Sequence, residues 1–377
     1  MLYPWQTASW DALTAQLQPD GRFPHALVLH GQSGIGKEAF ARHLAQALLC
    51  EEGQGAEVMR SRPCGRCSAC HWFEQGNHPD FHAVYPENLA PPAPPSADGD
   101  VPEKGKGAKA KGSAGGADAG GDDGDAKSKA LSKEIKIEQI RALLAFCGIG
   151  AHRGGRRVVL IYPAETLNGA AANAMLKTLE EPPAGVTFLL VSANLARLLP
   201  TIVSRCRQWP MSGPDRPLAT TWLAAQPGVP SPTAARDALA QTGGAPLAAL
   251  ALFGDPLHAA LLPLRDGLIQ QWSAGARCDA FVCADAVQKT AVPVVLAWLQ
   301  RWVYDLCSVK LTGRVRYFPG HEVALQRCAG QADALALTQF QQTLLRERMS
   351  EQHPLNPRLV FESLFVRYRA VFPPQAG

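Results

Sequence analysis

The sequence predicts an α/β fold, with a mostly parallel sheet and flanking helices, followed by an all-α C-terminal part. Three observations support this prediction. A buried strand, a glycine-rich loop and a helix follow one another near the N-terminus. Strands then alternate with helices up to about Pro210, and the remaining sequence shows only helical periodicity.

The N-terminal elements can be placed individually. Trp5, Trp10, Leu13 and Leu17 recur at helical spacing and predict an amphipathic opening helix. The apolar run "HALVLHG" predicts a buried strand ending at Gly31, and "EAFARHLAQALLC" has the composition of a helix.

The same alternation resumes after residue 133. The sequence predicts a helix in "IKIEQIRALLAFC", a strand in "RRVVLIY", and a second buried strand in "VTFLLVSA". Between the two strands, "NGAAANAMLKTLEEPP" predicts a helix that is stopped by Pro182 and Pro183.

The composition fits a chain of two or three domains. Of the 377 residues, 46% are hydrophobic, which is enough for buried cores. No apolar run reaches the length of a membrane span, and the first residues lack a secretory signal, so we expect a cytoplasmic protein without a membrane partner. The net charge of +4 does not by itself indicate nucleic-acid binding.

Residues 88–133 differ from the rest of the chain. Pro, Gly, Ala, Lys and Asp dominate this segment, and it contains no aromatic residue. Such a segment buries too little apolar surface to offset its ordering entropy, so we expect a disordered surface insertion. A DNA-binding arm is disfavoured because acidic residues are mixed with the lysines.

Four of the ten cysteines lie close together. Cys64, Cys67 and Cys70 have C-x₂-C-x₂-C spacing, and Cys50 ends the preceding predicted helix. In a reducing compartment, four soft ligands favour tetrahedral Zn²⁺ in a closed, structural site. His71 and His78 lie nearby, but four sulfurs leave them no coordination position.

Two alternatives to zinc stay open. An iron–sulfur cluster also uses C-x₂-C-x₂-C spacing, although the proline that usually follows a distant fourth cysteine is absent. The other alternative, four unrelated buried thiols, is disfavoured by the spacing.

The stretch "GQSGIGKEAF" nearly matches a phosphate-binding loop. Gly31, Gly36 and Lys37 fit the G-x-x-x-x-G-K-[ST] pattern, and Gly34 lies inside the loop. Glu38, however, occupies the position of the hydroxyl that ligates Mg²⁺. The loop amides and Lys37 are sufficient for weak phosphate binding at most.

An ATPase of this kind also needs acidic residues at the end of a following strand. Here the strand "RRVVLI" continues into Tyr162, Pro163 and Ala164. Glu165, the first acid, comes several residues too late. We therefore expect no ATP hydrolysis by this chain.

Arg205, in "TIVSRCRQW", follows a short predicted helical turn. It is either an ordinary surface arginine or an arginine finger that stabilises charge on the γ-phosphate of a neighbouring subunit's nucleotide. The residues alone do not favour the second interpretation.

Six motifs occur in an order that resembles the clamp-loader subunits of bacterial DNA polymerase III, members of the AAA+ superfamily. They are "FPHALVLHG", "GIGK", the four cysteines, "NHPDF", "NAMLKTLEEPPAGVTFLL" and "LLPTIVSRCRQ". The resemblance covers roughly residues 1–85 and 134–210, and "HPLNPRLVFESLFVRY" resembles the last collar helix of one such subunit.

The resemblance implies a layout for the chain. It predicts an AAA+ core over residues 1–211, with a zinc module at about 50–85, a small helical lid over 212–255 and a helical collar for oligomerisation over 256–377. Residues 88–133 depart from the compact family pattern.

The family includes an ATP-hydrolysing motor, gamma/tau, from which this sequence departs. Alignment on "LKTLEEPP" places Tyr162 and Pro163 at the motor's Asp-Glu pair, and alignment of "GGAPLAAL" places Leu247 at its sensor arginine. Together with Glu38, these departures favour a non-hydrolysing stator.

The preserved "SRC" implies a role in trans. By the resemblance, Ser204, Arg205 and Cys206 face the ATP of an adjacent gamma/tau subunit, with Arg205 as the finger. The implied partners are gamma/tau and delta in a hetero-pentamer, and, through the complex, the sliding clamp and primer–template DNA. Nothing in the chain resembles a polymerase or exonuclease site, so such activity would belong to the complex.

Two other functions are weighed against the stator. An ATP-hydrolysing motor of the same family predicts turnover by the isolated chain. A zinc-stabilised DNA-binding protein outside the clamp loader predicts a basic stripe with interleaved aromatic residues, which the charge pattern does not supply.

Overall fold

The computed structural model describes residues 2–15, 23–52, 61–91, 131–152, 155–349 and 356–373. The chain divides into two compact units, Met1–Gly31 with Lys37–Met211, and Gln32–Gly36 with Ser212–Gly377. Most of the predicted insertion, residues 92–130, lies outside the described residues.

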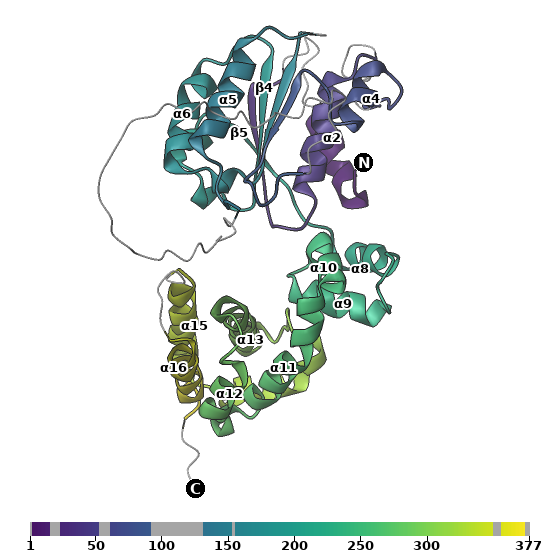
Figure 1. Ribbon diagram of the computed structural model, residues 1–377. Helices are drawn as coiled ribbons and strands as arrows, with labels where there is room; N and C mark the ends of the chain where they lie inside the picture. The colour runs from purple at the N-terminus through teal and green to yellow at the C-terminus, as the bar shows by residue number, and fades with distance from the viewer. Residues whose placement is uncertain are drawn as a thin grey trace, which may run out of the picture. The chain divides into compact units, whose positions relative to one another are not determined.

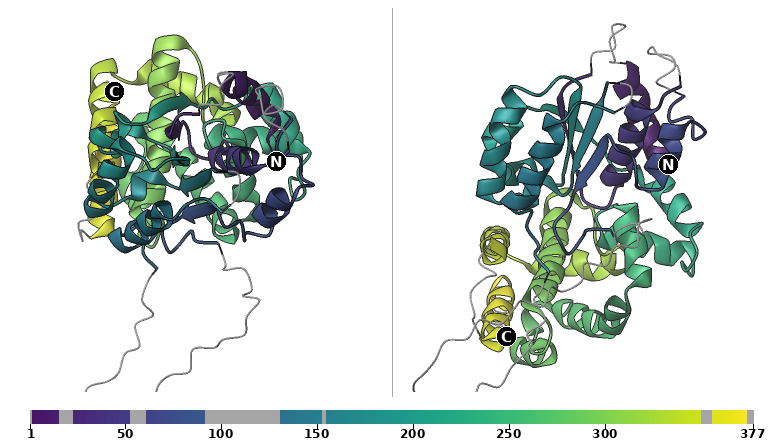
Figure 2. Two further views of the ribbon diagram at one scale, coloured as in Figure 1. Left: turned by 90° about the horizontal axis from the view of Figure 1, so that it is seen from above. Right: turned by 45° about the horizontal axis from the view of Figure 1, so that its top comes forward.

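The first unit is a five-stranded parallel sheet between two layers of helices (Figures 1 and 2). The strands follow the order β2-β3-β4-β1-β5. They are β1 (Ala26–His30), β2 (Phe81–Val84), β3 (Arg157–Ile161), β4 (Val186–Ser192) and β5 (Arg207–Pro210).

Helices α5 and α6 cover one face of this sheet, and α2 covers the other face with α4 beside it (Figure 1). The helical elements of the unit are η1 (Pro4–Gln6), α1 (Thr7–Ala15), α2 (Lys37–Leu49), α4 (Ser68–Glu74), α5 (Ile137–Gly148), η2 (Ala164–Thr166), α6 (Gly169–Glu180), η3 (Leu195–Arg197) and α7 (Pro200–Val203).

The apolar runs in the sequence correspond to the buried strands. Strands β3 and β4 are buried along their whole length, and β1 is buried except at His30. Parallel strands covered by helices on both faces carry such continuous apolar sequences. At the start of α6, the Asn168 side chain accepts a hydrogen bond from the Ala171 backbone N–H at 2.9 Å, which caps the helix.

The described residues of the second unit outside Gln32–Gly36 form only helices. These are α8 (Arg216–Ala224), α9 (Pro232–Gln241), α10 (Pro246–Gly254), α11 (Pro256–Trp272), η4 (Gly275–Arg277), α12 (Ala280–Val287), α13 (Val292–Thr312), η5 (Pro319–His321), α14 (Glu322–Gln331), α15 (Ala334–Met349) and α16 (Pro357–Ala370).

These helices pack around two apolar clusters. Helices α8 to α10 share a small cluster that includes Leu223 and Leu239. Helices α11 to α16 surround a larger one. In this larger cluster Trp302 Nε1 donates to the Tyr368 hydroxyl at 3.0 Å, and that hydroxyl donates to the Trp272 carbonyl at 2.7 Å, so the polar atoms of Trp302 and Tyr368 are satisfied inside the core.

The architecture predicted from the sequence is confirmed: a parallel α/β core carries a four-cysteine cluster and is followed by an all-α part. Strands β2 and β5 were not predicted individually. Among the described residues, no single helix meets the length and hydropathy criteria for a membrane span. Helices α10 and α11 meet them only as a pair, bent by 95°.

Candidate functional site

The four predicted metal ligands converge. The sulfur atoms of Cys50, Cys64, Cys67 and Cys70 all lie within 4.8 Å of one another. The Cys50–Cys67 and Cys64–Cys70 sulfur pairs are 4.0 and 3.9 Å apart. Tetrahedral Zn²⁺ with Zn–S bonds of about 2.3 Å requires sulfur separations of about 3.8 Å, so four thiolates in these positions could hold the ion.

Backbone groups orient these sulfurs. The Cys67 Sγ accepts from the backbone N–H of Cys70, and the Cys64 Sγ accepts from the backbone N–H of Cys67, each at 3.4 Å. The first of these bonds caps α4. Such N–H donors favour the thiolate form that a metal ion needs.

A second set of contacts closes the module around its cysteines. The Arg62 guanidinium donates two hydrogen bonds to the Glu52 carbonyl, at 2.9 and 2.7 Å. Arg66 forms an ion pair with the Glu52 carboxylate. These contacts tie the segment after α2 to the turn that carries Cys64, and so bring Cys50 to the other three cysteines.

The metal centre is separate from the phosphate loop. Lys37 begins α2, whereas Cys50 directly follows its last residue, Leu49. A helix of 13 residues is about 20 Å long. The four-cysteine cluster therefore lies at the opposite end of α2 from the phosphate loop.

The predicted phosphate loop has the backbone of a tight turn. Gly34 and Gly36 have φ values of 78° and 85°, a region that favours glycine. A Cβ atom at Gly34 would lie 2.6 Å from the Ala248 Cβ, and the Gly34 carbonyl accepts from the Leu247 backbone N–H at 3.0 Å. The first turn of α10 thus packs directly on the loop, with Leu247 contributing a backbone contact.

Glu38 is engaged inside the first unit. Its Oε1 accepts a hydrogen bond from the Tyr85 hydroxyl at 2.9 Å, and that hydroxyl accepts one from Arg42 Nη1, also at 2.9 Å. Burial, together with the Glu38 charge, raises the pKa of Tyr85 to about 12. Tyr162 lies against Tyr85, with ring centroids 6.2 Å apart.

Lys37 is almost enclosed, with 5% of its surface exposed. Burial lowers its pKa to about 8, and the negative charge of Glu165 partly opposes this shift. Glu165 also accepts a hydrogen bond from the Ala193 backbone N–H at 2.9 Å, so it joins η2 to the end of β4. Glu165, which lies too far along the sequence to serve as a magnesium ligand, thus raises the pKa of Lys37 through its charge.

Arg205 lies just beyond α7 and is held by its own chain. Its Nε donates to Glu180 Oε1 at 2.8 Å, and its Nη1 donates to the Thr201 carbonyl at 2.8 Å. The side chain is 30% exposed and that of Glu180 is 49% exposed. Exposed ion pairs of this kind contribute at most about 1 kcal/mol, so another anion can compete for the guanidinium.

Comparison with known proteins identifies the family. A family model described as "DNA polymerase III, delta subunit" matches residues 5–214. The DNA polymerase III subunit delta' of Pseudomonas aeruginosa is 31% identical over 387 residues, which cover 98% of each chain. The chain belongs to the delta-prime family of DNA polymerase III. The Escherichia coli subunit delta' is 31% identical over 303 residues, covering 80% of this chain and 75% of that one.

The chain is also similar to a different subunit of DNA polymerase III. The DNA polymerase III subunit tau of Escherichia coli is 31% identical over 195 residues, 52% of this chain and 23% of that one. A chain related to both types must be assigned a role from the residues at its sites rather than from sequence similarity alone.

In this delta-prime family member, the structure brings the four predicted cysteines together in one cluster. Three partners were missed by sequence reasoning, namely Tyr85 for Glu38, Glu180 for Arg205, and Glu165 for Lys37. Only Glu165 had a signal in the sequence, because it is the first acid after β3. The other two pairs join residues that no local pattern relates.

Proposed function

We propose that this chain is a non-hydrolysing stator subunit of the DNA polymerase III clamp loader. In this role it helps load the sliding clamp onto primed DNA during replication. It joins gamma/tau and delta subunits in a hetero-pentamer through a C-terminal helical collar, residues 256–377, which follows a small helical lid over residues 212–255. It also offers Arg205 in trans to ATP bound by a neighbouring gamma/tau subunit.

The observation that best supports the non-hydrolysing role is the hydrogen bond between Glu38 and Tyr85. Its carboxylate occupies the position of a magnesium-ligating hydroxyl and is bonded to Tyr85 at 2.9 Å. Strand β3 ends at Ile161 and is followed by Tyr162 and Pro163 instead of acidic residues. A loop without its magnesium ligand and without the strand-end acids cannot position the metal and the attacking water for hydrolysis.

The position of Arg205 supports the finger role. The side chain is partly exposed beyond α7, and its Glu180 partner is a surface carboxylate. A neighbouring γ-phosphate, which carries more charge and offers bidentate contacts, would compete well for the guanidinium. The Glu180 pair holds the finger in place until the nucleotide of the neighbour is presented.

We propose that the four cysteines hold a structural Zn²⁺ that stabilises the segment between α2 and β2. The donor set and the sulfur separations fit tetrahedral zinc, and four thiolates leave no open position for catalysis. The metal would supply folding free energy to a short segment with little apolar core of its own.

ATP turnover by reconstituted complexes tests the role. Complexes of gamma/tau, delta and this chain, with clamp and primed DNA, would be compared for wild type, Arg205→Ala and Arg141→Ala. Arg141 is an exposed arginine of the same unit and provides a matched loss of charge. We expect Arg205→Ala alone to lower hydrolysis at the one neighbouring ATP site, by about 10³–10⁵.

The isolated chain provides the second measurement. It should release no phosphate from ATP above the background of a Lys37→Ala variant. Turnover by the isolated chain would instead support the motor alternative and reject the stator. Equal hydrolysis by the wild-type and Arg205→Ala complexes would reject the finger and leave a scaffold. The alternative of a zinc-stabilised DNA-binding protein outside the clamp loader is disfavoured by membership of the delta-prime family.

A further inference from the structure

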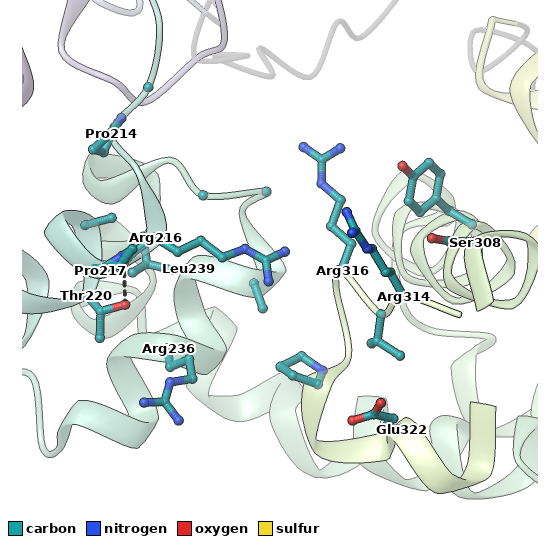
Figure 3. A pocket seen from close by; sticks show the side chains of 18 of the residues that line it. Pro214, Arg216, Pro217, Thr220, Arg236, Leu239, Ser308, Arg314, Arg316 and Glu322 are labelled. Carbon is teal, nitrogen blue, oxygen red and sulfur yellow. Dashed lines mark hydrogen bonds between the residues drawn. The ribbon is translucent and has the colours of Figure 1, made fainter. Parts of the chain in front are cut away.

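An arginine-lined pocket occupies the second unit. It has a volume of about 1550 Å³. Its lining comes from α8 and α9 on one side and from the end of α13 and the segment after it on the other. Figure 3 shows Arg216 reaching from the first side toward the segment that carries Arg314 and Arg316.

The pocket is strongly basic. Four arginines line it, namely Arg216, Arg236, Arg314 and Arg316, and all four are exposed. Among the described residues, none of the four forms a salt bridge, and Glu322 is the one carboxylate in the lining. Guanidinium groups on facing walls without neutralising carboxylates create a positive field in the space between them.

The segment that carries two of these arginines is held rigidly. The fully buried Asp305 carboxylate accepts backbone hydrogen bonds from Arg316, Tyr317 and Phe318, at 3.0, 2.8 and 2.8 Å. The Arg316 guanidinium lies over the rings of Tyr304 and Tyr317, 5.9 and 5.3 Å from their centroids. A buried acid that orders an exposed basic segment in this way presents the arginines in a defined position.

We propose that this pocket binds a short stretch of single-stranded nucleic acid. Arg216 and Arg314 contact phosphates from the two walls, and the exposed Tyr304, with Arg316 over its ring, stacks on a base. Planar guanidinium groups suit phosphate oxygens, and aromatic faces in a basic groove suit unpaired bases.

The size and lining favour a strand over the two other anionic ligands. Small-molecule sites usually have volumes of about 300–1,000 Å³, so this pocket exceeds the requirement of one nucleotide. An acidic peptide would leave the aromatic face of Tyr304 unused, whereas an unpaired base can stack on it. This site does not rest on the proposed ATP-site role, because it uses neither Lys37 nor Arg205.

Fluorescence anisotropy with the full chain tests the site. The probe is a labelled oligothymidine of about 12 nucleotides, within the length that one such groove accommodates. We expect Arg314→Ala/Arg316→Ala to weaken binding at least tenfold. Arg314 is the one proposed phosphate contact that this double variant removes, and each lost contact lowers the slope of log K against log salt by about 0.7, so the slope should fall by about 0.7.

Two matched variants separate the site from general charge. Arg358→Ala/Arg367→Ala removes the same charge from α16, outside the pocket lining, and should change affinity less than twofold. Tyr304→Ala should weaken binding about tenfold while Tyr304→Phe retains it, since stacking needs only the ring. Circular dichroism spectra and melting temperatures of each variant establish that it is folded.

Three outcomes would overturn the proposal. If Arg358→Ala/Arg367→Ala weakened oligonucleotide binding as much as Arg314→Ala/Arg316→Ala, the binding would be a non-specific charge attraction. Displacement of the labelled oligonucleotide by ATP at concentrations as low as those at which the oligonucleotide itself binds would indicate a single-nucleotide site. Tighter binding of an acidic dodecapeptide than of the oligonucleotide, lost in Arg314→Ala/Arg316→Ala, would indicate a protein ligand.

Discussion

Lys37 keeps the position of a phosphate-binding lysine but occupies an enclosed environment. The loss of solvent lowers its pKa from 10.5 to about 8, and Glu165 restores only part of the shift. An anion in the loop would favour the charged form of the amine. Without such an anion, the poorly solvated charge of Lys37 lowers the stability of the folded chain at neutral pH.

We predict a pH dependence of stability that belongs to Lys37. Between about pH 8 and 10.5 the unfolded chain binds a proton that the folded chain has released, so this residue makes the free energy of unfolding rise with pH across that window. Lys37→Met should lack this component and should be more stable than wild type at pH 7. Urea unfolding of both proteins at pH 7, 8 and 10 measures it, and an unchanged difference between them across the three pH values would contradict the prediction.

Arg157 is a buried cation whose partners are all within its own unit. Its Nε lies 3.3 Å from the Asp80 carboxylate, and the two side chains are 2% and 0% exposed. The guanidinium also donates to the carbonyl of Phe146, in the last turn of α5, and to that of Gly150, just beyond the end of the helix. It therefore joins the start of β3 to α5 and β2.

We predict that Arg157→Met destabilises the chain by about 3–5 kcal/mol, because Asp80 would stay buried without its cation. Arg141→Met, on the exposed face of α5, should change stability by less than about 0.5 kcal/mol. Denaturant midpoints measure both. The double variant Asp80→Asn/Arg157→Met should recover part of the loss, and an additive result would show that the charge pair is not the cause.

At the scale of elements, the proposed metal ion would contribute most to the stability of the four-cysteine module. We predict that the purified chain carries one equivalent of zinc and that Cys64→Ser loses most of it. Cys307→Ser, in α13, should retain the metal. Elemental analysis measures the content, and a coloured, iron-containing protein would support the iron–sulfur alternative instead.

Strands β2 and β5 show why some elements escape prediction. Each has four residues. Strand β5 carries the polar sequence "RQWP" and pairs only with β1, so it has neither an apolar run nor an alternating pattern. Their placement is decided by neighbouring strands, because edge pairing needs backbone groups rather than particular side chains.

At the scale of the whole molecule, the two units have separate apolar cores. One lies around the sheet and includes Val159, Phe188 and Leu190. Another lies among α11 to α16 and includes Trp272 and Trp302. Cores that share no residues can open as independent cooperative units.

We predict that the two units unfold at different urea concentrations, and that a zinc chelator lowers only the first unit's midpoint. Hydrogen exchange followed by mass spectrometry can report β1 and β4 separately from α13 and α16. The chelator should deprotect residues 61–74 first. One shared midpoint that moves as a whole with chelation would contradict independent cores.

Much of this organisation could be predicted because it depends on local patterns. Hydrophobic runs indicated β1, β3 and β4, and cysteine spacing indicated that the four cysteines form one cluster. The Tyr85–Glu38 bond and the Arg205–Glu180 pair could not be predicted, since both join residues that the fold alone brings together. The same holds for the basic pocket, whose four arginines come from three separate places in the sequence.

The Arg42–Tyr85–Glu38 chain has a consequence for the history of the phosphate loop. Replacing Glu38 with threonine would restore a metal ligand but would leave the Tyr85 hydroxyl without its acceptor, while Tyr162 and Pro163 still followed β3. Glu38→Thr alone would therefore lose a formed contact without restoring hydrolysis. On the proposed function, hydrolysis by this chain would need several simultaneous changes, so the chain depends on neighbouring subunits for its ATP chemistry.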